Sequence, residues 1–92
     1  MFKTLEELIA VIRQRKESST EESYTKKLLG NKKLSVEKVR EEVAELIDAI
    51  EKNSNKVHEA ADVLYHLMVL LEANGIKIED VMDELKKRKK IK

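Results

Sequence analysis

The chain has 92 residues, 40% of them charged, and its 19 lysines and arginines against 18 aspartates and glutamates leave a net charge of +1. This length predicts one small domain over residues 1–92, and the near-neutral charge argues against nucleic acid as a partner. The absence of cysteine excludes disulfides and thiolate metal sites, while the lack of a long apolar run or a signal-peptide core predicts no membrane partner and a cytoplasmic location.

Apolar residues recur at spacings of three and four almost throughout, which predicts an all-α fold of four to five helices. The first helix is expected to begin at Thr4, whose side chain can cap it while Glu7 reaches back to complete a capping box. A short helix over residues 23–29 should follow and end at Gly30, before a loop over residues 31–34.

Two long helices should form the centre of the domain. Ser35 is the expected cap of the first, which runs to about residue 53. The second, over roughly residues 56–74 before Gly75, is apolar around most of its circumference, so we expect it to be nearly enclosed. The first carries an apolar stripe of Val36, Val39, Val43, Leu46, Ile47 and Ile50.

A last helix is expected from near Glu79, and it ends in a basic run over residues 86–90. Such a run could contact nucleic acid, but the helix dipole already favours cations at a helix C-terminus. No aromatic residues are interleaved with these cations for base stacking. We therefore expect no nucleic-acid partner.

Acidic residues form two motifs on the long helices, Glu-Glu-x-x-Glu at residues 41–45 and Glu-x-x-Asp at residues 59–62. A short turn over residues 53–55 would make these helices antiparallel and place the motifs face to face. Two carboxylates about 4 Å apart repel by roughly 4 kcal/mol at an effective dielectric near 20, so several of them need a cation between them. Oxygen ligands in this number suit Mg²⁺, with Mn²⁺ as an alternative.

Other interpretations of these residues remain open. A row of glutamates on a lysine- and glutamate-rich helix is often only a solvated face. His66 shares a polar strip with Glu59 and Asp62, where a hydrogen bond to a neighbouring carboxylate or backbone group is favoured over metal binding. His58 is expected to be exposed. Cations could also pair with the carboxylates across the interface, and the candidates are Lys38, Arg40 and Lys56.

The pattern Glu41-Glu42-x-x-Glu45, thirteen residues, Glu59-x-x-Asp62 resembles the signature of the all-α, MazG-type nucleotide pyrophosphohydrolases. Within that group the chain resembles the phosphoribosyl-ATP pyrophosphohydrolase family over essentially its whole length. The most specific segment, residues 23–25 (Ser-Tyr-Thr), is not expected in relatives that only cleanse nucleotide pools. Arg40 stands where the family commonly has glycine, and nothing resembles the cyclohydrolase domain fused to this enzyme in some organisms. Further matching segments are residues 5–8, 15–16, 27–29, 38–39, 64–67 and 75–85.

The resemblance implies Mg²⁺-dependent hydrolysis of phosphoribosyl-ATP between its α and β phosphates. The products would be phosphoribosyl-AMP and pyrophosphate, in the second step of histidine biosynthesis. It also implies a homodimer in which long helices of two subunits form a bundle.

Functional residues can be carried over from the family by position. The implied metal ligands are Glu42, Glu45, Glu59 and Asp62. The implied catalytic carboxylates are Glu41, Glu42 and Glu45, with Glu41 orienting the water or supporting the ligands. The residues expected near nucleotide or phosphate are Arg15, Lys16, Tyr24, Thr25 and Lys27.

Two alternative functions are kept. A MazG-type pyrophosphatase acting on general or damaged nucleoside triphosphates would show little preference for the phosphoribosyl group. A non-catalytic helical dimer that serves as an interaction module would be stabilised when Glu45 or Asp62 is neutralised, without losing any Mg²⁺-dependent function.

Overall fold

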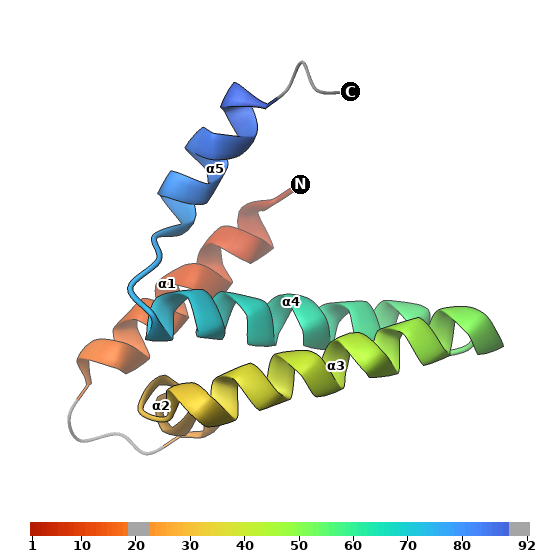
Figure 1. Ribbon diagram of the computed structural model, residues 1–92. Helices are drawn as coiled ribbons and strands as arrows, with labels where there is room; N and C mark the ends of the chain where they lie inside the picture. The colour runs from red at the N-terminus through yellow and green to blue at the C-terminus, as the bar shows by residue number, and fades with distance from the viewer. Residues whose placement is uncertain (19–22, 89–92) are drawn as a thin grey trace.

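The computed structural model describes residues 1–18 and 23–88, and these residues form five helices and no strand (Figure 1). The all-α fold expected from the apolar spacing is thereby confirmed. Within the described ranges, no helix is long and apolar enough to cross a membrane. The end of the basic run, residues 89–90, lies outside the described residues. The helices are α1 (Lys3–Glu17), α2 (Tyr24–Leu29), α3 (Lys32–Lys52), α4 (Lys56–Ala73) and α5 (Ile78–Lys87).

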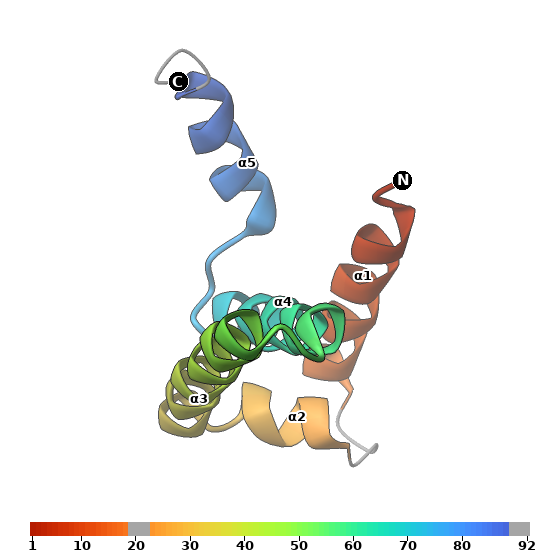
Figure 2. The same cartoon turned by 90° about the vertical axis from the view of Figure 1, so that its right-hand side faces the viewer.

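Helices α3 and α4 form an antiparallel hairpin, the most extensive helix pair in the described structure (Figure 1). In the turn between them, Asn53 and Asn55 have φ angles of 54° and 53°, a left-handed conformation that asparagine tolerates better than most residues. Figure 2 shows α1 and α5 diverging from one side of α4, whereas α2 lies on the other side. The short turn thus gives the antiparallel pair that the sequence predicts.

The hydrophobic core lies where α1, α2 and α4 meet. Ile12, Leu28 and Val69 are fully buried there, with Met68 beside them. Burying side chains of this size stabilises a fold by about 1.5 to 3 kcal/mol each. The core therefore fixes the short helix α2 against α4.

The starts of the first two helices test the predicted caps. No side chain caps α1, and its backbone hydrogen bonding begins upstream of Thr4, so the capping box with Glu7 is wrong. The α2 prediction is confirmed, because the Ser23 hydroxyl accepts the backbone N–H of Lys26 at 3.1 Å and Gly30 ends the helix.

The loop predicted over residues 31–34 is wrong, because α3 begins directly after Asn31. Asn31 caps the helix, since its Oδ1 accepts the backbone N–H of Leu34 at 3.0 Å. Ser35, the predicted cap, is buried, and its hydroxyl donates to the carbonyl oxygen of Leu28 at 2.6 Å. Ser35 therefore joins α3 to α2 instead of capping α3.

The apolar stripe of α3 is not fully covered within one chain. Ile47 and Ile50 are 52% and 56% exposed. The buried positions of α3 are instead Ser35, Glu42 and Ala49, which repeat every seven residues. One carboxylate of the acidic motif therefore lies on the inner face of the hairpin.

The prediction that the second long helix is nearly enclosed is wrong within one chain. Val57 and Leu64 of α4 are exposed, as are Ala60 and Ala61. Leu64 forms part of an open, mainly apolar groove between α1, α4 and α5. Other apolar side chains that line this groove, which we call the α1–α5 groove, are Phe2, Leu5, Ile9, Met68, Ile78 and Met82.

Helix α5 is attached to the rest of the fold by a bidentate ion pair. Arg13 of α1 donates from Nη1 and Nη2 to the two carboxylate oxygens of Glu79, at 2.9 and 2.6 Å. Its Nε also lies 3.6 Å from the carboxylate of Glu72. α5 begins at Ile78, one residue before the predicted start, and Gly75 with φ of 69° fits its predicted role as the terminator of α4.

We expect Glu79→Gln to lower the melting temperature at neutral pH and to have less effect in acid. The hydrogen bonds from Arg13 lower the pKa of Glu79 from 4.5 to about 2. Such a carboxyl contributes stability that is fully present above its unfolded pKa and is lost as the pH falls through its folded pKa. Circular dichroism melts of both proteins at pH 7, 4 and 2 measure this. A constant difference between them across the three pH values would contradict the role of the pair.

Candidate metal centre

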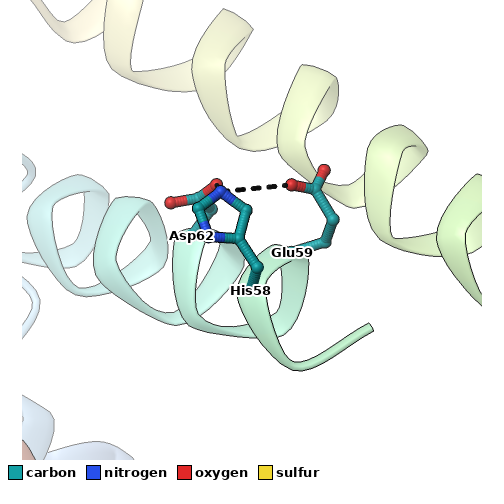
Figure 3. A group of neighbouring side chains, drawn as sticks. All are labelled: His58, Glu59 and Asp62. Carbon is teal, nitrogen blue, oxygen red and sulfur yellow. Dashed lines mark ion pairs between the residues drawn. The ribbon is translucent and has the colours of Figure 1, made fainter. Parts of the chain in front are cut away.

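The acidic motifs of α3 and α4 meet across the hairpin. One carboxylate oxygen from each of Glu42, Glu45 and Glu59 lies within 4.8 Å of the others. A second group within the same limit contains Glu59 again, with Asp62 and His58. Figure 3 shows this second group along one edge of α4, with the carboxylate of Glu59 directed toward the neighbouring helix α3. Because Glu59 belongs to both groups, the four predicted metal ligands form one continuous cluster.

Glu42 is the innermost carboxylate of the cluster. It is only 9% exposed, and its Oε2 has no hydrogen-bond partner among the described residues. Burial raises the pKa of Glu42 to about 7, assisted by a hydrogen bond and negative charge from Glu45 and by the charges of Asp62 and Glu59. A buried, charged carboxylate with an unpaired oxygen is costly, whereas a cation would stabilise its charged form. The cluster therefore fits a hard divalent cation such as Mg²⁺ or Mn²⁺, which takes oxygen ligands.

Glu59, on α4, is also a carboxylate whose pKa is raised by burial and by nearby negative charge. Burial raises the pKa of this carboxyl, and the negative charge of Glu45 acts in the same direction. His58 opposes both effects, because its positive form favours the ionised carboxylate. On both helices burial is the main cause of the raised pKa, and the neighbouring carboxylates at the contact between α3 and α4 add to it.

His58 takes part in the cluster, which the sequence analysis missed. Its Nε2 lies 3.4 Å from Oδ2 of Asp62 and 3.8 Å from Oε1 of Glu59 (Figure 3). The prediction that His58 is exposed is confirmed, but its position four residues before Asp62 places both side chains on one face of α4. This spacing was the signal that could have identified the contact.

Glu41 lies outside both groups of candidate ligands. Its side chain is exposed, and its carboxylate lies 3.5 Å from Nζ of Lys38 on the same helix. Among the other cations considered, Lys56 donates to the side chain of Asn53. The ion pair of Lys38 is therefore made with Glu41 at the rim and not with the inner carboxylates.

Two of the predicted substrate residues, Tyr24 and Thr25 of α2, are hydrogen-bonded to α4 beside the cluster. The hydroxyl of Tyr24 is 3.0 Å from Nε2 of His66, and the hydroxyls of Thr25 and Tyr65 are hydrogen-bonded to each other. Nδ1 of His66 lies 2.9 Å from the carbonyl oxygen of Asp62. His66 therefore bonds to a backbone group, which is one of the two options that the sequence favoured.

One predicted cationic substrate residue, Lys16, makes its hydrogen bond away from the cluster within one chain. Nζ of Lys16 donates to the carbonyl oxygen of Glu72 at 2.9 Å. This carbonyl lies ten residues beyond Asp62 on α4, about 15 Å along the helix axis. Arg15 is half-buried on α1, and Lys27 is exposed on α2. The structure thus assigns Lys16 a contact at the C-terminal end of α4.

Comparison with known proteins adds independent information. The sequence profile of the family described as phosphoribosyl-ATP pyrophosphohydrolase matches residues 5–89. A phosphoribosyl-ATP pyrophosphatase of Clostridium novyi is 45% identical, with 94% of this chain and 81% of that protein covered. One from Allorhizobium ampelinum is 41% identical, with 92% and 85% covered.

Longer relatives match as well. The chloroplastic histidine biosynthesis bifunctional protein hisIE of Arabidopsis thaliana is 45% identical over 92% of this chain, but only 33% of that protein is covered. The bifunctional protein HisIE of Pyrococcus furiosus is 46% identical, with 94% of this chain and 41% of that protein covered. The chain therefore spans well under half of these bifunctional relatives.

Proposed function

Because the chain belongs to the phosphoribosyl-ATP pyrophosphohydrolase family, we propose that it hydrolyses phosphoribosyl-ATP in histidine biosynthesis. Water adds to phosphorus, the P–O bond between the α and β phosphates breaks, and phosphoribosyl-AMP and pyrophosphate are released. The observation that carries this proposal is the buried carboxylate of Glu42, whose Oε2 has no hydrogen-bond partner among the described residues and which lies among three further carboxylates.

Glu42, Glu45, Glu59 and Asp62 would hold the Mg²⁺ that this reaction needs, and Mn²⁺ prefers the same oxygen ligands. The bound ion would neutralise phosphate charge and lower the pKa of a coordinated water. Glu41, on the exposed side of the same turn, is our candidate for orienting the attacking water. Tyr24 and Thr25 of α2, hydrogen-bonded to His66 and Tyr65 of α4, are our candidates for contact with the nucleotide.

We also propose a homodimer in the cytoplasm. The α1–α5 groove leaves apolar side chains of three helices open to solvent, and the stripe of α3 adds exposed isoleucines. Contiguous apolar surface of this kind marks sites of protein association. A second copy whose helices fill the groove would bury Leu64 and supply the enclosure of α4 that one chain lacks.

Pyrophosphate release by the purified chain tests the function directly. Phosphoribosyl-ATP, ATP and a deoxynucleoside triphosphate are compared in one assay with Mg²⁺, with Mn²⁺ and with a chelator. We expect turnover of phosphoribosyl-ATP to exceed that of the other two and to stop when the metal is chelated. Similar rates on all three would favour general nucleotide cleansing, and no turnover on any would favour an interaction module.

A further inference from the structure

Consecutive residues of α2 are paired with consecutive residues of α4. Tyr24 is hydrogen-bonded to His66, and Thr25 is hydrogen-bonded to Tyr65. The rings of Tyr24 and Tyr65 are stacked with centroids 6.4 Å apart, and each meets the ring of His66 edge to face, at 5.9 and 4.9 Å. α2 has only six residues, which is too short for a stable isolated helix. Its position therefore depends on contacts such as these.

In the neutral form of His66, its hydrogen bonds fix which atom donates in each. The carbonyl oxygen of Asp62, 2.9 Å from Nδ1, can only accept, so Nδ1 donates. In the neutral imidazole Nε2 then accepts, and the Tyr24 hydroxyl is the donor. The Tyr24 hydroxyl thus donates its hydrogen bond to His66. What Tyr24 presents to a ligand is its ring.

The burial of the two rings differs. His66 is 7% exposed, whereas Tyr24 is 48% exposed. Tyr24 also lies in the field of the carboxylate cluster: burial raises the pKa of its hydroxyl, Lys38 acts against this, and Tyr65, Glu42 and Glu41 act with it. A buried histidine therefore connects an exposed tyrosine to the same turn of α4 that carries Asp62.

From this geometry we propose that His66 is a positioning residue for the substrate. It holds Tyr24 of α2 at a fixed place relative to the metal-binding turn of α4, so that the exposed part of Tyr24 meets the nucleoside part of the substrate. This inference rests on the proposed function, because it assigns Tyr24 to the same substrate site. Both ring nitrogens of His66 are already hydrogen-bonded within the chain, so His66 would act through Tyr24 and not on the metal or the phosphate directly.

Two substitutions of His66 each keep one of its two hydrogen bonds and remove the other. The side-chain N–H of Asn in His66→Asn falls near Nδ1 and keeps the bond to the Asp62 carbonyl, but it does not reach Tyr24. The amide oxygen of Gln in His66→Gln reaches the position of Nε2 and accepts from Tyr24. Tyr24→Phe removes the same bond from the other side. Ser35→Ala is the matched control, because it removes a buried hydrogen bond that joins α2 to α3, away from Tyr24.

The first readout is the dissociation constant of α,β-methylene-ATP with Mg²⁺, measured by calorimetry, since a carbon bridge at the cleaved position prevents turnover. The second is the KM and kcat for phosphoribosyl-ATP. Circular dichroism melts accompany both measurements to compare stability.

Loss of one positioning hydrogen bond should weaken binding and raise KM by about three- to ten-fold in His66→Asn and in Tyr24→Phe, with little change in kcat. The double variant that combines His66→Asn with Tyr24→Phe should bind no more weakly than either single variant, because both substitutions remove the same hydrogen bond. His66→Gln should stay within about two-fold of the wild type, and Ser35→Ala should lose stability without losing affinity.

Wild-type binding by His66→Asn, additive losses in the double variant, or an equal defect in His66→Gln would each overturn the positioning role. So would failure of the wild type to bind the analogue. If the wild type binds the analogue but does not hydrolyse phosphoribosyl-ATP, the proposed function fails, and the comparison of dissociation constants still decides the role of His66.

Discussion

Glu42→Gln is expected to reduce metal-dependent hydrolysis by about 10³-fold or more and, at the same time, to stabilise the metal-free protein. The loss of activity follows because a metal ion contributes several kcal/mol to stabilising the transition state of such a reaction, and each 1.4 kcal/mol is a factor of ten in rate. The gain in stability follows because glutamine removes a charge that is buried beside three other carboxylates.

The gain in stability should depend on pH. The pKa of Glu42 is raised from 4.5 to about 7 in the folded, metal-free chain. A carboxyl with a raised folded pKa does not affect stability below its unfolded pKa of 4.5, and it destabilises the fold increasingly as the pH rises toward 7. Above pH 7 the shift corresponds to about 3 kcal/mol, or a melting temperature higher by roughly 15 °C in the variant.

Thermal melts with a chelator at pH 5, 6, 7 and 8 measure this difference. The advantage of Glu42→Gln should be small at pH 5 and largest at pH 8, and added Mg²⁺ should stabilise the wild type more than the variant. Glu37→Gln, which neutralises an exposed carboxylate on the same helix, is the control and should show neither effect. A variant that remains active, or that is less stable than the wild type at pH 8, would refute the assignment of Glu42 to a metal site.

The carboxylate cluster could be predicted from the sequence because it depends only on helical spacing and a short turn. Glu42 and Glu45 are three residues apart on α3, Glu59 and Asp62 are three apart on α4, and a three-residue turn makes the helices antiparallel. Spacing did not reveal which carboxylate is buried. That depends on the rotation of α3, which places Glu42 inward and Glu41 at the rim.

The cap of α3 and the burial of its apolar stripe could not be predicted from the sequence pattern alone. Asn31 and Ser35 are both good helix caps, and the structure uses Asn31 as the cap and Ser35 as a buried link to Leu28. Apolar periodicity predicts that a face is buried, but it does not distinguish burial within the chain from burial against another molecule. The isoleucines of α3 and Leu64 of α4 lie on such apolar faces, yet they are exposed within one chain.

Leu64→Glu is expected to dissociate the proposed homodimer. Leu64 lies on α4 in the α1–α5 groove and is 43% exposed in one chain. Covering the exposed part of this side chain contributes about 1 kcal/mol, and in a two-fold symmetric dimer each substitution occurs twice. The dissociation constant should therefore rise by about 30-fold from lost burial alone, and further because a carboxylate would have to be buried in the interface.

Val11→Glu provides the matched control for this experiment. Val11 is also 43% exposed, but it lies on α1 and is not among the described residues that line the groove. Sedimentation equilibrium should therefore find a dimer for the wild type and for Val11→Glu, and a single subunit of reduced melting temperature for Leu64→Glu. Dissociation by both substitutions would show that the groove is not the interface, and a folded, active wild-type monomer would exclude an obligate dimer. All four candidate metal ligands come from one chain. Any loss of activity on dissociation must therefore arise from lost stability or from lost substrate contacts. Measurements of metal affinity and of KM distinguish these two causes.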